Sequence, residues 1–432
     1  MAPPQTRPLK NRSQYLAKLI AFADTKPVKI VTGIRRCGKS SLLDLMIQHL
    51  LANGISPDQI LKMNFESYAF DKMTRDSFHD YVTAHCPKDK RLYLFLDEPH
   101  KIPGWETVVN SLRVDLDCDI YITGSNAHML SSEYATYLSG RYIEIKLYPL
   151  SFAEFLDFHG FIIKTENTLL GRRKTICDAN ETRYTLAEVF NAYLRFGGMP
   201  GIAETGLDEE KTAVLLDGIY STVITNDILA RQNMKGTVKI ANPLLLKRIG
   251  LFLADNIGKI TSPSKMTAYL KTEKDAGGSY HTVSDYLTAL EESYLFYEAK
   301  RFDIKGKALL KTLSKYYIAD LGLRNYLLGY AETDRGACLE NVVYFELLRR
   351  GYDVSIGKIG DLEVDFRAVK NGAVLYVQVS ESLASPRTLE RELAPLQKIA
   401  DNFEKLILTG DGGSSQYQGI GIKNIAEWLL DF

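Results

Sequence analysis

A strand-like run, a glycine-rich loop and a helix-like run follow one another near the start of this chain, and together they limit its fold more than any other feature. The apolar run Val28–Thr32 leads into Gly33-Ile-Arg-Arg-Cys-Gly-Lys39-Ser40, which matches the pattern G-x-x-x-x-G-K-[ST]. The helix-like run Ser41-Leu-Leu-Asp-Leu-Met-Ile comes next. A P-loop requires these elements in this order, so the sequence predicts an α/β fold that binds a nucleotide.

Each residue type in this loop suits ATP and Mg²⁺. The glycines let backbone N–H groups curve around the β-phosphate, and the following helix N-terminus favours negative charge. The Lys39 ammonium would bridge the β- and γ-phosphates, and the Ser40 hydroxyl would ligate Mg²⁺. A glycine-rich turn without a ligand is the alternative. The predicted ATP-binding residues are Gly33, Ile34, Arg35, Arg36, Cys37, Gly38, Lys39, Ser40, Ser41 and Ser125.

Two carboxylates end a second apolar run, Arg91-Leu-Tyr-Leu-Phe-Leu-Asp97-Glu98. Asp97 would hold the water shell of Mg²⁺, and Glu98 would polarise the attacking water. By itself the pattern marks no more than the end of a strand. Its position downstream of a P-loop is what points to catalysis.

Two further positions are candidates for contact with the γ-phosphate. Ser125 and Asn126 follow the strand-like run Ile120–Thr123, and a polar side chain there can reach the γ-phosphate or the attacking water. Arg141 follows Gly140, and arginine suits the charge that develops on the γ-phosphoryl oxygens. Arg141 could act within its own subunit or across an oligomer interface. A plain turn and an ordinary surface arginine are the alternatives for these positions.

Length and composition set the wider frame. The chain has 432 residues, which suits two or three domains. It has 53 basic and 53 acidic residues, so contact with nucleic acid must come from local basic patches. Five scattered cysteines argue against a disulfide framework and fit a reducing cytosol. No signal-peptide core or membrane-spanning run is found, so we expect a cytoplasmic protein without membrane contact.

Apolar runs and their spacing predict three regions. Residues 1–150, with the P-loop, form an ATPase domain with a parallel sheet and helices on both faces, 151–335 a mostly helical lid and winged-helix-like region, and 336–432 a further α/β domain in which strands return, whose resemblance to a nuclease is given below. Within the middle region the polar stretch Glu166–Arg183 is expected to be a loop. The predicted strands of the first region are Val28–Thr32, Ile60–Phe65, Leu92–Leu96, Ile120–Thr123 and Tyr142–Leu147.

Runs along nearly the whole chain resemble a known family. "GIRRCGKSSLL", "FLDEPHKIPGWE", "ITGSNAHML", "LSGRY" and "YPLSFAEFL" are similar to AAA-type ATPases related to archaeal ATPases, which carry a C-terminal domain of unknown function. "YLRFGGMPG", "YSTVITNDILAR" and "DLGLRNYLLG" resemble the middle of those proteins. The resemblance implies that Ser125 or Asn126 is the sensor and Arg141 the candidate finger. It implies that the ATPase residues are Lys39, Ser40, Asp97 and Glu98.

Residues 244–320 can be read as a winged helix. Helices are expected at Ser262–Leu270 and His281–Glu292, and the runs Tyr294–Arg301 and Leu309–Tyr317 would pair as the wing. The wing is the most basic local region, because it carries six basic residues and one acid, Asp303. Lys311 and Lys315 are two of these six basic residues. Acids on the second helix repel phosphates, so a packing module is the alternative. The predicted DNA-binding residues are Lys300, Arg301, Lys305 and Lys307.

The last region resembles a restriction-endonuclease-like core. Such a site holds Mg²⁺ between carboxylates and uses a lysine to activate water. Ser380 stands where that lysine is expected, so the sequence predicts a non-cleaving relic, and buried paired carboxylates are the simpler alternative. Asn371-Gly372 lies between two strand-like runs and predicts a hairpin. The residues of the relic are Glu340 on a helix and Glu363, Asp365 and Gln378 on strands.

These features leave three functions open. In the first, a homo-oligomer such as a ring uses ATP and Mg²⁺ to bind or remodel DNA, including branched DNA. In the second, a nucleotide-gated switch recruits a protein partner, and in the third the chain is an ATP-dependent nuclease. The basic wing favours the first function, whereas zero net charge and the missing lysine favour the second.

Overall fold

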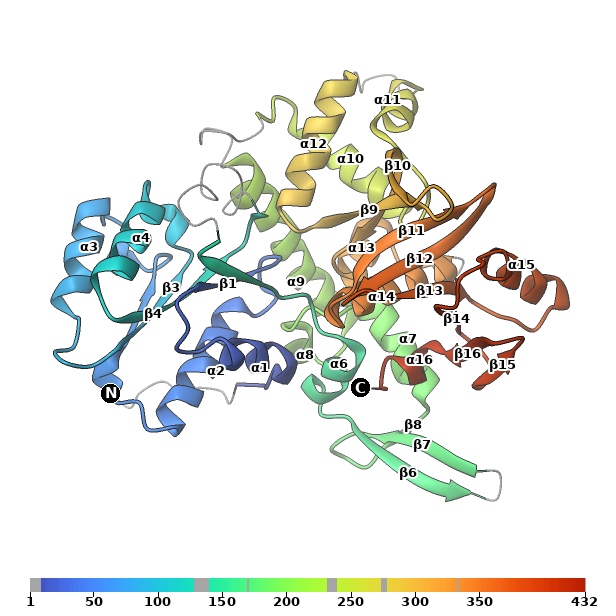
Figure 1. Cartoon of the computed structure of the whole chain (residues 1–432), viewed down its shortest axis with the longest axis horizontal. Coiled ribbons are helices and arrows are strands. Elements are labelled where there is room, and N and C mark those ends of the chain that lie inside the picture. The colour runs from blue at the N-terminus through green and yellow to red at the C-terminus, as the bar shows by residue number, and fades with distance from the viewer. Residues whose placement is uncertain are drawn as a thin grey trace. The chain divides into compact units, whose positions relative to one another are not determined.

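The structure is a computed structural model that describes residues 9–127, 140–168, 171–230, 239–272, 278–331 and 334–431. The chain divides into two compact units. One contains residues 1–147 and 292–294, and the other contains residues 148–291 and 295–432 (Figure 1). The predicted α/β class is confirmed, because the first unit is built on a parallel sheet and the second contains a mixed sheet.

The first unit has a five-stranded parallel sheet with the strand order β2-β3-β4-β1-β5. Every residue of β1 and β3 is buried, and most of them are apolar; the charged exception in β1, Lys29, pairs with the buried Asp119. Because all five strands run in the same direction, the residues that follow β1, β3 and β4 gather at one edge of the sheet. The five predicted strands are confirmed, with bounds Val28–Thr32 (β1), Ile60–Asn64 (β2), Leu92–Asp97 (β3), Cys118–Gly124 (β4) and Tyr142–Lys146 (β5).

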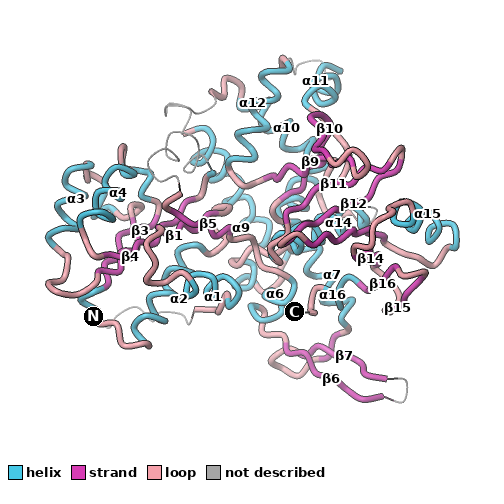
Figure 2. The backbone as a smooth tube through the Cα atoms, in the orientation of Figure 1, coloured by secondary structure: helices cyan, strands magenta, loops and turns pink. Residues whose placement is uncertain are grey.

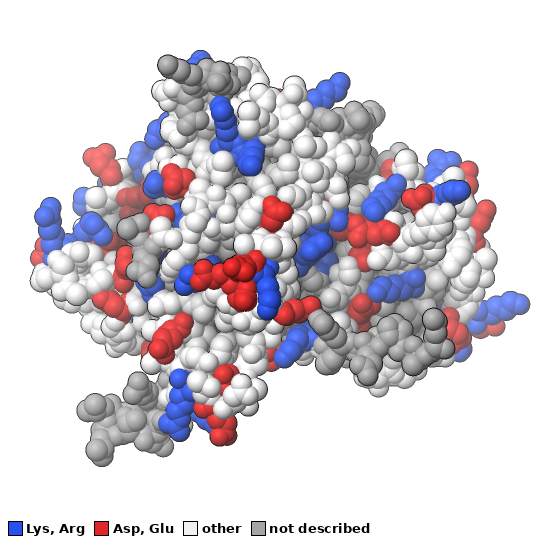
Figure 3. All heavy atoms as spheres, turned by 180° about the vertical axis from the view of Figure 1, so that it is seen from behind, with Lys and Arg blue, Asp and Glu red and all other residues white. Residues whose placement is uncertain are grey.

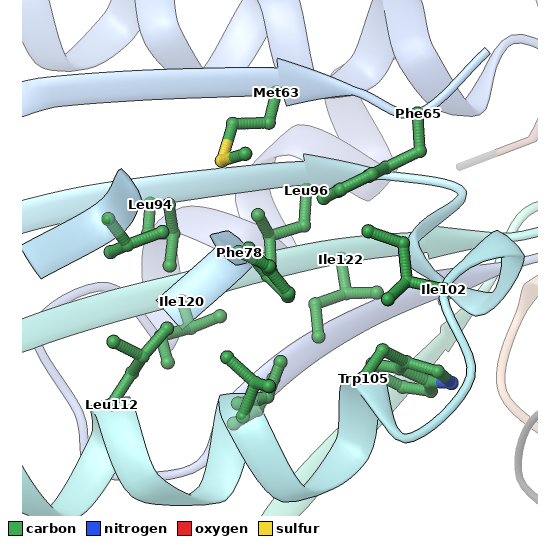
Figure 4. Close-up of a cluster of buried hydrophobic side chains, with 14 of the residues drawn as sticks. Met63, Phe65, Phe78, Leu94, Leu96, Ile102, Trp105, Leu112, Ile120 and Ile122 are labelled. Carbon is green, nitrogen blue, oxygen red and sulfur yellow. The ribbon is translucent and has the colours of Figure 1, made fainter. Parts of the chain in front are cut away.

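Helices cover this sheet (Figure 2). Helix α2 (Lys39–Ala52) packs against β4 and contacts α1 (Ser13–Ala21). Helices α3 (Arg75–Ala84) and α4 (Trp105–Asp115) contact each other and place Phe78, Trp105 and Leu112 against alternate residues of the strands (Figure 4). The strand side chains in this core include Leu94, Leu96, Ile120 and Ile122.

The second unit begins with α6 (Phe152–Phe158) and a small three-stranded antiparallel sheet. The prediction that Glu166–Arg183 is a loop is wrong, because this stretch lies largely in β6 (Ile162–Thr168), β7 (Gly171–Cys177) and β8 (Arg183–Tyr184). Backbone hydrogen bonds pair β6 with β7, and the described side chains of this pair form no apolar face. Among its described side chains only Ile176 and Cys177 are buried, so the sequence lacks the alternation that marks a strand.

Helices form the middle of the second unit. Helix α13 (Leu321–Leu328) contacts α7 (Leu186–Phe196), α9 (Glu209–Thr222) and α10 (Pro243–Asp255). A π-helix, Val223–Leu229, continues α9, and α8 covers Ile202–Thr205. The two predicted helices of the winged-helix-like part are confirmed as α11 (Pro263–Thr272) and α12 (Tyr280–Glu292).

An eight-stranded mixed sheet completes the unit, in the order β10-β9-β11-β12-β13-β14-β16-β15. The predicted pairing of the wing strands is confirmed, but β9 also pairs in parallel with β11, so the wing strands continue the C-terminal sheet. The predicted hairpin is confirmed, with Asn371 and Gly372 at φ values of 50° and 82°. The strands are β9 (Phe296–Asp303), β10 (Ala308–Ile318), β11 (Asp353–Ile359), β12 (Leu362–Lys370), β13 (Ala373–Ser380), β14 (Glu404–Thr409), β15 (Ser415–Tyr417) and β16 (Ile420–Asn424).

Three helices accompany this sheet: α14 (Arg335–Arg349), α15 (Pro386–Gln397) and α16 (Ile425–Trp428). Helix α14 contacts β10 to β13, and α15 contacts β12 to β14. Within the described ranges, every helix is too short or too polar to cross a lipid bilayer.

Candidate nucleotide site and C-terminal acid cluster

The P-loop makes a tight bend at the carboxyl end of β1. Gly33 and Gly38 have φ values of 143° and 101°, a region that glycine adopts without strain. A Cβ atom at Gly33 would lie 2.1 Å from the carbonyl oxygen of Leu147, so no larger residue fits there. Helix α2 begins at Lys39, directly after the loop, and its N-terminal N–H groups therefore open towards the loop.

Lys39 is buried within this loop. Its Nζ donates to the carbonyl oxygens of Gly33 at 3.0 Å and Ile34 at 3.1 Å. An ammonium held this way can exchange carbonyl oxygens for phosphate oxygens with a small side-chain movement. Of the other predicted loop residues, Ile34 and Cys37 are buried, whereas Arg36, Ser40 and Ser41 are exposed.

The Arg35 side chain pairs with an acid that lies outside the P-loop. Its Nη1 lies 3.0 Å from Glu66 Oε1, and Lys101 Nζ lies 3.6 Å from the same oxygen. Arg35 is therefore held by an acid outside the loop in this conformation.

Asp97 and Glu98 lie at the carboxyl end of β3, beside Thr123 of β4. The Thr123 hydroxyl donates to Asp97 Oδ1 and accepts from the Glu98 backbone N–H at 3.1 Å. All three residues are buried. One hydroxyl thus fixes both acids, and Asp97 keeps its second carboxylate oxygen outside that bond.

The Glu98 side chain is hydrogen-bonded by one neighbour, Ser125, and lies close to a second, His100. Ser125 Oγ donates to Glu98 Oε2 at 3.3 Å, and His100 Nδ1 lies 3.2 Å from the same oxygen. Glu98 itself has left-handed backbone angles, φ 56° and ψ 47°, which turn the chain sharply after the strand. The structure therefore brings together the predicted Glu98 and Ser125. His100 was not among the predicted site residues, although it lies two residues beyond Glu98 in the same short motif.

Asn126 is buried one residue beyond Ser125, next to the end of β4. Parallel pairing places this strand end beside the end of β1, since Gly124 lies opposite Thr32. Asn126 is therefore at the P-loop edge of the sheet, and its role as a sensor stays a prediction.

Arg141 lies at the other edge. Its carbonyl accepts from the N–H of Val28, the first residue of β1, whereas the P-loop follows Thr32, the last. A five-residue strand spans roughly 13–17 Å, which exceeds the reach of an arginine side chain. Arg141 Nη1 donates to Asn110 Oδ1 at 3.2 Å. The strand register thus argues against a role at its own P-loop and leaves a role across an interface as a prediction.

Tyr294, which is distant in sequence, is linked through Glu144 to the residue that precedes the P-loop. Thr32 Oγ1 donates to Glu144 Oε1 at 2.7 Å, and the Tyr294 hydroxyl lies 3.4 Å from the same oxygen. Tyr294 is 5% exposed and belongs to the three-residue segment that joins the first unit. Glu144 therefore connects Tyr294 with the residue immediately before Gly33.

The acids predicted as a nuclease-like relic meet around a buried lysine. Lys315 Nζ on β10 lies 2.9 Å from Glu340 Oε1, 2.8 Å from Glu363 Oε1 and 3.7 Å from Asp365 Oδ1. Burial acts to lower the pKa of Lys315, but the three carboxylates outweigh it and the pKa lies above its ordinary value. Burial and the Glu340 charge raise the pKa of Asp365 to about 7.

Lys315 corrects the expectation that this cluster lacks a lysine. Ser380, in the expected lysine position, instead donates from Oγ to the carbonyl of Ser382 at 3.1 Å. Gln378 accepts from the Asp365 N–H at 2.7 Å and donates to Glu392 Oε2 at 2.8 Å. The sequence contained one sign of this buried lysine, since Lys315 lies in the apolar end of a predicted strand. Within the described ranges, no group of three or more His, Cys, Asp or Glu side chains could hold a metal ion.

The wing tip is basic, but less so than the sequence suggested, because Lys315 is buried. The side chain of Lys311 lies outside the described residues. Lys300, Lys305 and Lys307 are exposed, and Arg301 is half-buried. Asp303 Oδ1 accepts from the N–H groups of Lys305 and Gly306, both at 3.1 Å, and closes the turn. On the face drawn in Figure 3, basic and acidic side chains are interspersed.

Two solved structures are weakly similar to this one over most of the chain. A Walker-type ATPase of Pyrococcus abyssi has a TM-score of 0.48 and 17% identity, covering 76% of this chain and 99% of its own. The Orc1 protein of Aeropyrum pernix, solved with DNA, has a TM-score of 0.32 and 11% identity, covering 75% and 94%. Likenesses at this level support no conclusion about function.

Comparison of sequences gives a firmer result. A family model described as the AAA domain matches residues 25–156, and a domain of unknown function, DUF8612, matches residues 187–334. An uncharacterized protein of Haemophilus influenzae is 39% identical over 424 residues, covering 97% of this chain and 98% of its own length. An uncharacterized protein of Methanocaldococcus jannaschii is 30% identical over 396 residues, covering 88% and 82%. With its AAA domain and P-loop, the chain therefore belongs to the family that includes these Haemophilus influenzae and Methanocaldococcus jannaschii proteins.

Proposed function

We propose that this chain binds ATP with Mg²⁺ at the P-loop and hydrolyses the γ-phosphate with Glu98 as general base. One observation carries the proposal: parallel strands bring the P-loop, Asp97, Glu98 and Asn126 to the same edge of one sheet. The Asp97 carboxylate and the Ser40 hydroxyl are the hard oxygen donors that suit Mg²⁺, which supplies charge neutralisation at the phosphates.

Each residue then has a defined task. Lys39 would exchange its two loop carbonyls for phosphate oxygens, and Asp97 and Ser40 would hold the cation. Glu98, oriented by Ser125 and His100, would accept the proton of the attacking water. Release of phosphate from ATP by the full chain, with Mg²⁺ and with excess EDTA, tests this directly. Absence of Mg²⁺-dependent release would remove the proposal.

We propose a homo-oligomer in which Arg141 contributes to the P-loop of a neighbouring subunit. Its position at the edge of the sheet opposite its own P-loop supports this assignment. A mixture of Arg141→Ala and Lys39→Ala proteins is then expected to regain part of the hydrolysis that each lacks, because intact P-loops would meet intact arginines. Phosphate release by verified mixed oligomers measures this. Failure of such oligomers to regain activity would leave Arg141 without this role.

We propose DNA as the partner of the wing, on the strength of three exposed lysines around the β9–β10 turn. Each contact between lysine and phosphate releases counterions, so affinity should fall steeply with salt. The double variant Lys305→Gln/Lys307→Gln is expected to lower the slope of log affinity against log salt by about 2. Fluorescence anisotropy with duplex and branched DNA measures the slope, and Lys88→Gln/Lys90→Gln is a control. An unchanged slope would place the DNA surface elsewhere, and a protein partner of a nucleotide-gated switch would gain weight.

We further propose that the acid cluster does not cleave DNA. The Lys315 ammonium lies in contact with Glu340 and Glu363, so it neutralises the carboxylates that would otherwise attract a divalent cation. Incubation of plasmid and branched DNA with the protein, ATP and Mg²⁺ or Mn²⁺ is expected to give no cutting. Cutting that disappears in Asp365→Ala would establish an ATP-dependent nuclease instead.

A further inference from the structure

An arginine that lies well before the first strand contacts the backbone of the P-loop. Arg12 precedes Cys37 by 25 residues, is 3% exposed, and donates from Nη1 to the Cys37 carbonyl oxygen at 3.2 Å. Hydrogen bonds from a charged donor are stronger than those from a neutral one. Arginine is rarely buried this deeply, so its position against the loop is a specific feature of the nucleotide site.

The start of α1 fixes the position of Arg12. Its carbonyl oxygen accepts from the N–H groups of Tyr15 at 3.0 Å and Leu16 at 2.9 Å, which begins the helix. Its guanidinium carbon lies 4.9 Å from the centroid of the buried Tyr15 ring, within the range of a cation–π contact. Helix α1 in turn contacts α2, which begins at Lys39 (Figure 2). Arg12 is therefore held by both its main chain and its side chain.

The bonded carbonyl determines the direction of the next N–H group in the loop. The Cys37–Gly38 peptide is trans and planar, so its C=O and N–H bonds point in opposite directions. Because the carbonyl faces Arg12, the Gly38 N–H points away from Arg12. Within the described ranges, this N–H donates to no backbone carbonyl. It is therefore available to a ligand of the P-loop.

The charge of Arg12 also acts on the loop. Burial raises the pKa of the Cys37 thiol, whereas the charges of Lys39 and Arg12 act in the opposite direction. The Cys37 thiol lies 3.5 Å from the Leu147 carbonyl oxygen, so the side chain and the carbonyl of this residue both have defined contacts. Two cations, one from the motif and one from outside it, therefore favour negative charge at this part of the loop.

We propose that Arg12 is a positioning residue of the nucleotide site, which holds the Cys37–Gly38 peptide so that the Gly38 N–H can bind the β-phosphate of ATP or ADP. The inference rests on the proposed ATP site and adds to it a residue that the P-loop motif does not contain. Arg12 acts through the peptide that it holds. A donor that is already oriented binds phosphate without the cost of turning the peptide, so Arg12 should affect nucleotide affinity more than the chemical step.

Arg12→Met removes the charge and the donor but keeps a long side chain. Titration of the full chain with fluorescent ATP and ADP analogues in Mg²⁺ is expected to show both affinities weakened by about tenfold. In steady-state hydrolysis the KM for ATP should rise by a similar factor, whereas kcat should change by less than about threefold. Arg12→Lys, which restores a charge and a donor without the planar fork, should recover part of the affinity.

Lys18→Met is the matched control. Lys18 is exposed on the same helix, and its Nζ lies 5.6 Å from the centroid of the same Tyr15 ring. This variant removes a cation from α1 and should leave both affinities and the KM unchanged. Partial unfolding of Arg12→Met would lower the concentration of active protein, and hence the apparent kcat, but it would not raise the KM. The two constants therefore separate a positioning role from a purely structural one.

Three outcomes would count against the inference. Unchanged affinities and KM in Arg12→Met would overturn it and leave the proposed ATP site intact. A loss confined to kcat would also overturn it, since Arg12 would then stabilise the fold without positioning the loop. If the unaltered chain binds neither ATP nor ADP, the proposed function itself fails, and the inference fails with it.

Discussion

Lys39→Ala is expected to abolish ATP hydrolysis, with a loss of at least about a hundredfold, and to weaken ATP binding. Lys39 is the buried ammonium that the loop carbonyls of Gly33 and Ile34 hold in place. Alanine cannot supply that charge to the β- and γ-phosphates. Phosphate release and titration with a fluorescent ATP analogue measure the two effects.

The control for this variant is Lys62→Ala. Lys62 is a partly exposed lysine on β2 that pairs with Asp44, so its loss removes a charge from the same unit without touching the loop. Thermal unfolding of both variants reports whether the fold survives. A folded Lys39→Ala protein with full turnover would refute the assignment of the P-loop as the hydrolytic site.

Glu98→Gln is expected to bind ATP with Mg²⁺ normally and to hydrolyse it about a hundredfold more slowly or worse, a barrier increase of ~2.7 kcal/mol. Glutamine keeps the size of the side chain but cannot accept the proton of the attacking water. The variant should therefore accumulate in the ATP-bound state. Single-turnover hydrolysis measures the chemical step, and retention of labelled ATP after gel filtration measures the trapped state.

Glu66→Gln is the matched control for the general base. Glu66 is also an acid close to the P-loop residues, where Arg35 and Lys101 pair with it, but it has no proposed part in proton transfer. It should retain turnover within a few fold. Normal turnover by Glu98→Gln would show that another group positions the water.

The nucleotide site could be predicted from sequence because most of its parts are local. Gly33 to Ser41 form strand end, loop and helix start in one continuous run, and Asp97 and Glu98 directly end another apolar run. The position of Arg141 at the opposite edge of the sheet can also be predicted, because Arg141 directly precedes β5 and β5 pairs in parallel with β1. The geometry around Glu98 was less accessible, because the position of His100 depends on a left-handed turn that no apolar pattern marks.

The acid cluster could be predicted only in part, because the position of its lysine was not evident from the sequence. Glu340, Asp365 and Gln378 were expected together, but Lys315 comes from a strand assigned to a separate basic wing. Its position depends on the parallel pairing of β9 with β11, which joins segments far apart in the chain and leaves no local signature. The hairpin of β6 and β7 was missed for a related reason, since backbone pairing there does not depend on burial of side chains.

Tyr294, whose hydroxyl hydrogen-bonds Glu144, is synthesised long after Thr32 and Glu144. The P-loop and its strands are complete in the nascent chain once residue 147 has been made, but Tyr294 is still missing. At 5–20 residues per second, synthesis of the intervening segment takes roughly 7–30 s. During that interval the first unit exists without one of its buried aromatic side chains. We therefore expect nucleotide affinity to be acquired late in translation, after most of the helical middle has been synthesised.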